Sequence, residues 1–495
     1  MKHIDSKHNF IIIKQAKGRK DGLVPPGTKI LDLLWEYCKL YRPWCIYLRE
    51  VAGRPYSERS LQQMKRVLII TYYWPPAGGI GVQRWLQFSK NLPEHGWTPV
   101  IFTAENANYP IIDPKLNEQV PGNMEIHRVR VPEPNNILSL FQKKSNGNKQ
   151  IYKLQQQSGV DNSIFKKMLW KIRGNFFIPD ARMFWQGPSY QYLKKYLSEN
   201  RIDAIITTGP PHTTHLIGQK LKQEFKIPWV ADFRDPWTSM DYLKKMGLSD
   251  FARRKHERLE KSVVLNATRM VVVGKTIQRE FKEKYDVDSL IIYNGYANSQ
   301  PGSNDVQLDT KFSIAHVGSF LHNRNCADLW ECLSELTKTN SEFAKDLKIK
   351  LVGKIAPVVL QTLEEFGLTS FLTIIDQVDH ESALKIQRSA QLLLLPIDRI
   401  ENAEFVLSGK LFEYLQAKRP ILLIGPPGGD AAQVIRDCLA GEVCNFNDMF
   451  ALKKSVLSFY EKFRSNENFS KSVNINQFAY KNLTTQIANL LESIV

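Results

Sequence analysis

The chain has 495 residues, too many for one hydrophobic core, so we expect two domains with additional segments. Its formal net charge of +17 at pH 7 favours anionic partners, although general solubility of a basic protein is a competing interpretation. No helix-turn-helix, zinc-finger, RRM or KH pattern accompanies the charge, so we expect no nucleic-acid partner. No apolar run reaches the roughly 20 residues of a membrane-spanning helix.

The cysteines and the amino-terminal segment indicate in which cellular compartment the protein is expected. The six cysteines form no C-x-x-C and match neither a zinc module nor a disulfide framework. The amino-terminal segment has three consecutive Ile but no signal-peptide core with a small-residue cleavage site. Both features predict a cytoplasmic protein with reduced thiols.

Residues 1–64 are expected to be an extension rather than the start of a domain. Within them, Lys29–Val51 is apolar, aromatic and basic, with a helical spacing that is interrupted near Pro43. One interpretation is a peripheral helix at the inner face of the cell membrane, in contact with anionic lipid. The other is a helix packed on the main body of the protein.

A regular alternation of strands and helices begins at Arg66. A short apolar run at 66–73 is followed by a glycine-rich loop, an amphipathic helix at 82–96 and a second strand at 98–104. Residues 132–175 are polar and irregular, and we expect an excursion over the surface. Further strands are expected at 203–209, 228–233, 269–274 and 289–295. This βα alternation predicts a Rossmann-like, acceptor-side domain over 65–297.

A plausible linker at 297–310 separates this region from a second series of strands and helices. Strands are expected at 312–318, 348–353, 371–376, 392–397 and 420–425, with helices at 325–338, 357–366, 380–390, 409–418 and 430–438. These predict a second Rossmann-like domain over 298–480, followed by a carboxyl-terminal helix at 481–495 that packs back on the first domain. The fold class is therefore α/β, with two doubly wound domains facing a central cleft that holds the active site.

Gly78, Gly79 and Gly81 lie between the first strand and its helix. Glycines at this place let backbone N–H groups approach an anion, and the helix N-terminus adds a favourable partial charge. The pattern is neither G-x-G-x-x-G nor a Walker A loop, so a tight βα turn is an alternative explanation.

Three segments together resemble a known enzyme clan: the one just described (72–104), TTGPPHTTHLIGQKLKQEFKIPWVADFRDPWT (207–238) and SGKLFEYLQAKRPILLIGPPGGDAAQVI (408–435). They are similar to retaining GT-B glycosyltransferases of the glycogen-synthase/mannosyltransferase-like clan, over about residues 65–480. The resemblance implies a nucleotide-sugar donor, a glycan or lipid-linked acceptor and a role in cell-surface polysaccharide biosynthesis. It implies no metal and no other cofactor.

Glu413 is the first residue that the resemblance assigns, as the acceptor of hydrogen bonds from the donor ribose. The clan has a second Glu eight positions earlier, near the donor sugar. Here that position is Phe405, and Glu404 is one residue out of register. Either Glu404 reaches the site, or the backbone at Ser408 and Gly409 contacts the donor sugar.

Two cations are expected at the diphosphate. By the clan's pattern, Arg324 and Lys410 stabilise the negative charge that develops on the departing nucleoside diphosphate. Gly318 and Gly353 end strands that face the same cleft, and they either approach the nucleotide or serve only as turn residues.

The first domain contributes polar residues after two strands. Where the clan has a His, this chain has Phe-Arg-Asp, so that role falls to Arg234 or Asp235, or moves to His212. His212 and His215 have the spacing of a metal pair without a third ligand, which favours a capping or hydrogen-bonding role. A D-x-D sequence at Asp286 and Asp288 lies in the wrong context for a metal site.

Two other functions remain open. One is a nucleotide-sugar epimerase, which would carry paired acid/base carboxylates in the first domain. The other is a catalytically degenerate binding subunit, which the displaced Glu404 favours. An NAD-dependent oxidoreductase is disfavoured because the dinucleotide fingerprint is missing.

Overall fold

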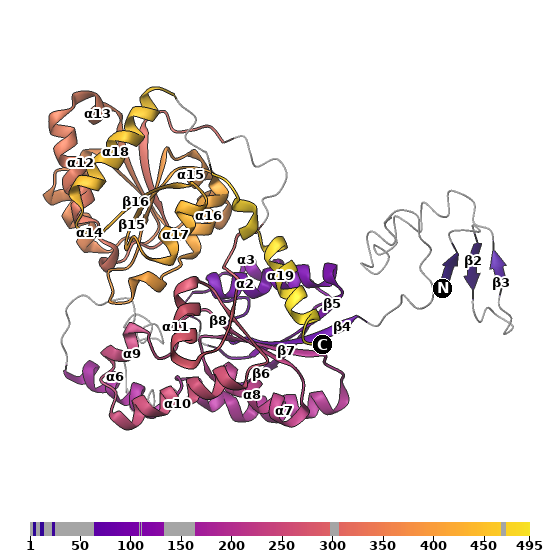
Figure 1. The fold of residues 1–495 in the computed structure, drawn as a ribbon. Coiled ribbons are helices and arrows are strands. Elements are labelled where there is room, and N and C mark those ends of the chain that lie inside the picture. The colour runs from indigo at the N-terminus through magenta and orange to yellow at the C-terminus, as the bar shows by residue number, and fades with distance from the viewer. Residues whose placement is uncertain are drawn as a thin grey trace, which may run out of the picture. The chain divides into compact units, whose positions relative to one another are not determined.

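The computed structural model describes residues 64–107, 109, 111–132, 164–297, 306–466 and 472–495, and the backbone of three strands near the amino terminus. The chain divides into two compact units, Met1–Gln63 and Met64–Val495 (Figure 1). In the first unit, β1 (His3–Asp5), β2 (Phe10–Ile13) and β3 (Gly22–Val24) form an antiparallel sheet. The predicted helix at Lys29–Val51 lies outside the described residues.

The second unit begins with a seven-stranded parallel sheet in the order β10-β9-β8-β7-β4-β5-β6. Its strands are β4 (Lys65–Ile70), β5 (Trp97–Ala104), β6 (Glu125–Val129), β7 (Ala204–Gly209), β8 (Trp229–Phe233), β9 (Arg269–Val272) and β10 (Leu290–Ile291). The first of them, β4, pairs with β5 on one side and β7 on the other, so the strand order reverses there. Ligands of doubly wound sheets bind outside the carboxyl ends of the strands at such a reversal.

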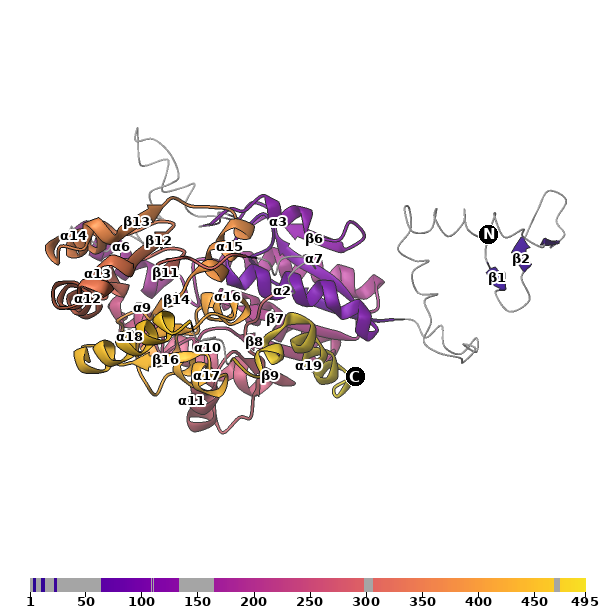
Figure 2. The same ribbon diagram turned by 90° about the horizontal axis from the view of Figure 1, so that it is seen from above.

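Helices cover both faces of this sheet (Figures 1 and 2). They are α2 (Ile80–Asn91), α3 (Lys115–Glu118), α6 (Ile164–Phe176), α7 (Gln186–Glu199), α8 (Thr213–Phe225), α9 (Asp241–Lys245), α10 (Asp250–Asn266) and α11 (Lys275–Tyr285). The prediction of an irregular segment over 132–175 is wrong for its described end, because α6 begins at Ile164.

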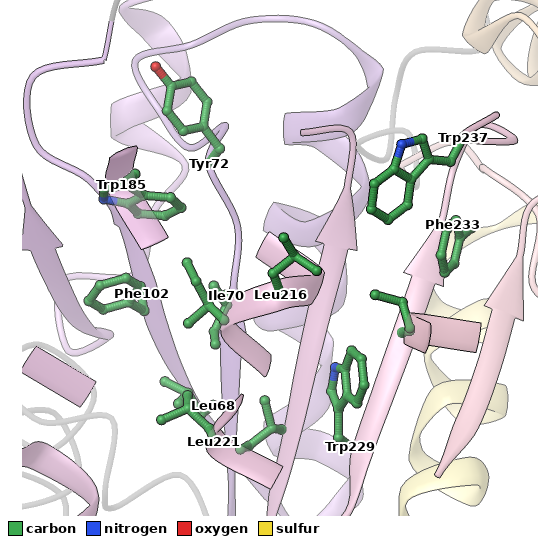
Figure 3. Packing of buried hydrophobic residues seen from close by; sticks show 14 of the residues in the cluster. Leu68, Ile70, Tyr72, Phe102, Trp185, Leu216, Leu221, Trp229, Phe233 and Trp237 are labelled. Carbon is green, nitrogen blue, oxygen red and sulfur yellow. The ribbon is translucent and has the colours of Figure 1, made fainter. Parts of the chain in front are cut away.

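The strands of the first sheet are apolar in long runs because both of their faces are covered. Leu68 and Ile70 of β4 are inaccessible to solvent, and so is Phe102 of β5. Figure 3 shows Leu68 beside Leu221 and Ile70 beside Leu216, and the rings of Phe102 and Trp185 stack with centroids 5.5 Å apart. This packing fixes the position of the loop that follows β4.

A second parallel sheet has the order β13-β12-β11-β14-β15-β16. Its strands are β11 (Phe312–Val317), β12 (Leu347–Val352), β13 (Leu372–Ile375), β14 (Leu392–Pro396), β15 (Ile421–Ile424) and β16 (Gly441–Cys444). Its helices are α12 (Ala327–Thr339), α13 (Ser341–Asp346), α14 (Pro357–Glu365), α15 (His380–Ser389), α16 (Gly409–Ala417), α17 (Asp430–Asp437) and α18 (Met449–Arg464). The order reverses between β11 and β14, so the loops after these two strands adjoin.

The carboxyl-terminal helix α19 (Tyr480–Glu492) returns to the first sheet, as the sequence predicts. Tyr480 meets Phe88 of α2 edge-on with ring centroids 5.4 Å apart, and Leu483 and Leu491 are buried in the same cluster. In both ribbon views α19 lies beside α2 (Figures 1 and 2). Within the described part of the chain, no helix has the length and apolar character needed to cross a bilayer.

Candidate functional site

Each of the three predicted glycines in the loop after β4 has a steric reason, and at Gly78 a Cβ would lie 2.8 Å from Ile111 Cγ2. Gly79 has a φ of +101°, which L side chains rarely adopt. A Cβ at Gly81 would lie 1.9 Å from a guanidinium nitrogen of Arg234, so only glycine admits that side chain. The Gly78 N–H donates to the carbonyl of Ile111 at 3.0 Å, which holds the loop against the next βα connection.

Arg234, in the loop after β8, therefore lies against the start of α2. Its Nε donates to Thr208 Oγ1 at 3.1 Å, and its guanidinium also donates to the Pro210 carbonyl. No carboxylate forms an ion pair with it among the described residues. Its neighbour Asp235 makes no hydrogen bond within the same ranges, and burial raises the pKa of the Asp235 carboxyl.

Asp232, at the end of β8, has a structural role. It is inaccessible to solvent and forms an ion pair with Arg84 of α2 at 2.8 Å. It also accepts hydrogen bonds from Trp85 Nε1 at 2.9 Å and Thr208 Oγ1 at 2.8 Å. Since Thr208 Oγ1 also accepts a hydrogen bond from Arg234, this network holds the Arg234 side chain in position.

His212 stands at the start of α8 with its ring stacked on Trp237, at a centroid distance of 4.5 Å. Neither of its ring nitrogens has a hydrogen-bond partner in the described part of the protein, so the predicted capping or hydrogen-bonding role is wrong for His212. His215 does form a hydrogen bond, between its Nδ1 and Thr207 Oγ1 at 2.8 Å. Burial lowers the pKa of both imidazoles, that of His215 to about 3, so both are neutral.

In the second half, the N-terminus of α16 approaches the glycine loop of the first half. Ser408 caps the helix by accepting a hydrogen bond from the Lys410 N–H at 3.4 Å. A Cβ at Gly409 would lie 2.6 Å from Cδ1 of Ile80, the residue between Gly79 and Gly81. The two predicted glycine segments thus meet, one from each half.

Lys410 and Arg324 converge on one carbonyl oxygen, that of Ser319. Lys410 Nζ donates to it at 3.0 Å, and Arg324 approaches it at 3.5 Å while holding Asp398 in a bidentate ion pair at 2.7 and 2.9 Å. Lys410 also lies 3.3 Å from His316 Nε2, and no carboxylate is within ion-pairing distance in the described ranges. Burial, and then the charge of Arg324, lowers the pKa of Lys410 to about 7.

The glycines that end β11 and β12 make room for Lys410. Gly318 has a φ of +112°, and a Cβ there would lie 2.3 Å from Lys410 Cε. Gly353 has a φ of +104°, and a Cβ there would lie 3.2 Å from the Gly318 backbone. Without side chains, these two glycines leave space for the Lys410 side chain at the edge of the sheet.

The two predicted glutamates occupy different places. Glu413 is half-buried one turn after Lys410 and accepts a hydrogen bond from Gln387 of α15 at 3.1 Å. Glu404 is exposed on a short 3-10 helix; its nearest cation is Arg279 at 3.8 Å, and its backbone packs near Gly429 at the start of α17. No contact in the described ranges joins Glu404 to Glu413.

Asp398 and His316 belong to this cluster but were not predicted. The signal for Asp398 was its place directly after β14, the strand that borders β11 at the reversal of strand order. His316 is inside β11 and resembles an ordinary buried strand residue. Both became visible only when the two strands were placed side by side.

The two carboxylates of the D-x-D sequence form ion pairs with a nearby lysine. Asp286 and Asp288 form ion pairs with Lys282 of α11, at 2.7 and 3.1 Å, and both are exposed. The described residues contain no group of three or more His, Cys, Asp or Glu side chains that could hold a metal ion.

The sequence matches no family model and no curated protein. Solved structures do match. Sucrose-phosphate synthase from Thermosynechococcus elongatus is 14% identical with a TM-score of 0.55, over 87% of this chain and 98% of that chain. HepE of Anabaena in complex with UDP-glucose is 12% identical with a TM-score of 0.55, over 86% and 99%. TarM of S. aureus, in complex with UDP among other ligands, is 12% identical with a TM-score of 0.55, over 86% and 100%.

The chain has the GT-B fold. The two parallel sheets of seven and six strands, each with a reversal of strand order, confirm the predicted fold class. At these identities the likeness concerns the fold. Within the GT-B fold, the site residues of the first half lie in the loops after β4, β7 and β8. Those of the second half lie at the end of β11, in the loops after β11, β12 and β14, and on α16.

Proposed function

We propose that the protein is a glycosyltransferase that transfers a sugar from a nucleotide-activated donor to a glycan or lipid-linked acceptor, with retention and without a metal. The observation that carries this proposal is the convergence of Lys410 and Arg324 on the Ser319 carbonyl beside the N-terminus of α16. This arrangement suits an anion with more than one negative charge. Two cations and a helix N-terminus lie together there, and Asp398 is the one carboxylate in the cluster that balances them among the described residues.

A nucleoside diphosphate fits this place chemically. Glycosyl transfer breaks the bond between the sugar and the diphosphate, and negative charge grows on the departing phosphate. Lys410 and Arg324 would stabilise that charge, and the Asp398 carboxylate holds the Arg324 guanidinium in position. Two of the GT-B structures similar to this chain hold UDP-glucose or UDP, which agrees with such a ligand.

Glu413 would bind the nucleoside rather than the phosphates. Its carboxylate is half-buried, accepts only the one hydrogen bond from Gln387 in the described part, and lies one turn beyond Lys410. Its remaining lone pairs suit two adjacent ribose hydroxyls.

The first half would face the transferred sugar and the acceptor. Arg234 contacts the glycine loop that meets α16, and Asp235 beside it has an unpaired carboxyl whose pKa is raised by burial. A carboxyl of this kind is suited to hold a sugar hydroxyl or to receive its proton. A role in cell-surface polysaccharide biosynthesis, at the inner face of the membrane, belongs to the same proposal.

A binding subunit with the same fold is the second candidate. It is favoured by the position of Glu404, which is exposed and makes no contact with Glu413 in the described ranges. Such a subunit would bind the nucleotide sugar without turning it over.

One experiment separates these candidates. A panel of nucleotide sugars is incubated with the protein, with and without lipid-linked acceptors and with EDTA, while hydrolysis, transfer and binding are followed. We expect turnover of at least one donor that survives EDTA, with the anomeric configuration of the product retained by NMR. Binding without turnover would favour the subunit, and full loss on chelation, restored by magnesium or manganese, would overturn the metal-independent mechanism.

A further inference from the structure

Several large apolar side chains are exposed at one end of the first half. On α6, Met168, Ile172 and Phe176 recur every four residues and are 52%, 39% and 73% exposed. This spacing places them on one face of the helix. Phe251, on the first turn of α10, is also 73% exposed.

Helices α6 and α10 present these side chains around one shared loop, residues 246–249. The Ser249 N–H donates to Asn175 Oδ1 at 2.7 Å, and Asn175 Nδ2 donates to the Gly247 carbonyl at 3.3 Å. A Cβ at Gly174 would lie 2.7 Å from Leu248, so the end of α6 is in direct contact with the loop. Helices α6 and α10 therefore meet at this short segment, with Phe176 next to Asn175 in the sequence and Phe251 two residues after Ser249. Figure 1 shows the two helices at the same end of the first half.

A cavity of about 780 Å³ opens at this loop and is strongly basic. Its lining includes Gly247 and Leu248, the carboxylate Glu257 and six cationic side chains: Lys244, Arg253, Arg254, Arg258, Lys261 and Lys284. Three of these are held by Glu401, Asp250 and Glu280.

The other three cations, Arg254, Arg258 and Lys261, have no ion-pair partner among the described residues. They recur at intervals of four and three residues, so they follow one exposed face of α10. The lining of the cavity is thus net positive, with this row of three cations and the one carboxylate of Glu257 on α10, and the exposed Phe251 lies one turn before Arg254 on the same helix.

We propose that this α6–α10 surface binds an anionic lipid bilayer. The row on α10 would receive lipid phosphates, and Phe176, Phe251 and the apolar face of α6 would enter the boundary between headgroups and acyl chains. Charge complementarity selects an anionic occupant, and the adjacent exposed apolar face selects a bilayer over a free phosphate or a polyanion. The proposal does not depend on the glycosyltransferase assignment, because vesicle binding is measured without turnover.

The charge arm of the test uses the full chain with vesicles of phosphatidylcholine alone or with phosphatidylglycerol. Arg254→Gln/Arg258→Gln should bind the anionic vesicles at least about tenfold more weakly than the wild type, because each basic side chain near such a surface adds severalfold to the affinity. The matched control is Lys338→Gln/Lys454→Gln, which removes the same charge from exposed positions on α12 and α18. It should bind as the wild type does.

The apolar arm compares Phe176→Ser/Phe251→Ser with Phe450→Ser, which changes a side chain that is 82% exposed on α18. Only the α6–α10 pair should weaken binding, also by about tenfold, since a bilayer removes these rings from water. All the changed side chains are exposed, and unchanged thermal unfolding would show that each variant is folded.

Two results would overturn the proposal. If the phenylalanine pair binds as tightly as the wild type, while the α10 pair loses affinity for both vesicles and heparin, the surface recognises polyanions and not bilayers. If the α10 pair binds vesicles unchanged and Arg42→Gln/Arg49→Gln does not, the membrane contact belongs to the amino-terminal extension.

Discussion

The two halves of the GT-B fold each place a cation beside the carboxyl edge of a sheet, buried in the first half and half-buried in the second, but they balance its charge differently. In the first half, Arg84 is inaccessible to solvent and forms an ion pair with Asp232 at 2.8 Å. In the second half, Lys410 has no carboxylate partner in the described ranges and shares the Ser319 carbonyl with Arg324.

This difference indicates that Arg84 is a structural cation, whereas Lys410 is free to bind a ligand. The charges of Arg84 and Asp232 neutralise each other, and Trp85 and Thr208 occupy further lone pairs of the carboxylate. Near Lys410, the acid that forms an ion pair among the described residues is Asp398, and its partner is Arg324. A buried cation without a counter-charge has a lowered pKa, and an arriving anion would restore its charge.

The largest expected effect tests the structural side of this comparison. Asp232→Ala leaves Arg84 buried without its partner, which should lower the free energy of unfolding by about 3–5 kcal/mol. Denaturant unfolding followed by tryptophan fluorescence measures this. The control Asp288→Ala, at an exposed site whose ion pair in the described ranges is with Lys282, should change it by less than about 0.5 kcal/mol. Equal losses in the two variants would remove the structural role of Asp232.

The second prediction tests the ligand side. Lys410→Gln should leave stability unchanged or higher, because it removes an unpaired, half-buried cation. It should weaken nucleoside diphosphate binding by about 1.5–3 kcal/mol, the usual worth of a hydrogen bond to a charged group. Calorimetry with a panel of nucleoside diphosphates gives the affinity, and Lys418→Gln, at the exposed end of the same helix, is the control. If Lys410→Gln unfolds easily but binds normally, the roles of the two cations are reversed.

The third prediction concerns the two glutamates of the second half. Glu413→Ala should weaken binding of the nucleoside diphosphate by about 1–3 kcal/mol, because the ribose hydroxyls lose their acceptor. Glu404→Ala should have a smaller effect, since Glu404 is exposed and lies beside α17 rather than α16. The same calorimetric panel measures both. A larger loss in Glu404→Ala would show that the out-of-register glutamate is the donor residue after all.

Much of the fold follows from the sequence because most strands are covered on both faces. The last four residues of β4 and all four residues of β15 are buried, and such apolar runs are easy to recognise. The strands that were missed carry little of this signal. No residue of β6 is buried and only the last of β16 is, because both strands lie at sheet edges.

The candidate site was predictable only in part, for a different reason. The resemblance drew attention to Lys410 and Arg324, and they do lie together. Their setting depends on contacts between distant segments: Arg324 meets Asp398 across 74 residues, and Lys410 meets His316 across 94. Such pairs appear only when β11 and β14 are adjacent. The role of Glu404 stays a prediction, because distance along the chain from Glu413 does not show which way a loop turns.

The smallest and most specific prediction is that nucleoside diphosphate binding depends on pH through Lys410 of the second half. Burial lowers the pKa of Lys410 from its ordinary value of 10.5 to about 7, whereas the buried cation of the first half is paired with a carboxylate. Anion binding requires the protonated lysine, so the affinity for a nucleoside diphosphate should fall as the pH rises from 7 to 9, by up to about tenfold per unit.

Stability without ligand should move the other way over the same range. Between about pH 7 and 10.5 the unfolded chain holds a proton on Lys410 that the folded chain has lost, so this residue's contribution to the free energy of unfolding increases with pH. Lys410→Arg keeps the charge and should flatten both dependences, which also separates the lysine from titration of the ligand's own phosphate. An affinity that is flat across this range in the wild type, or a slope that Lys410→Arg retains, would show that Lys410 is not the residue that meets the diphosphate.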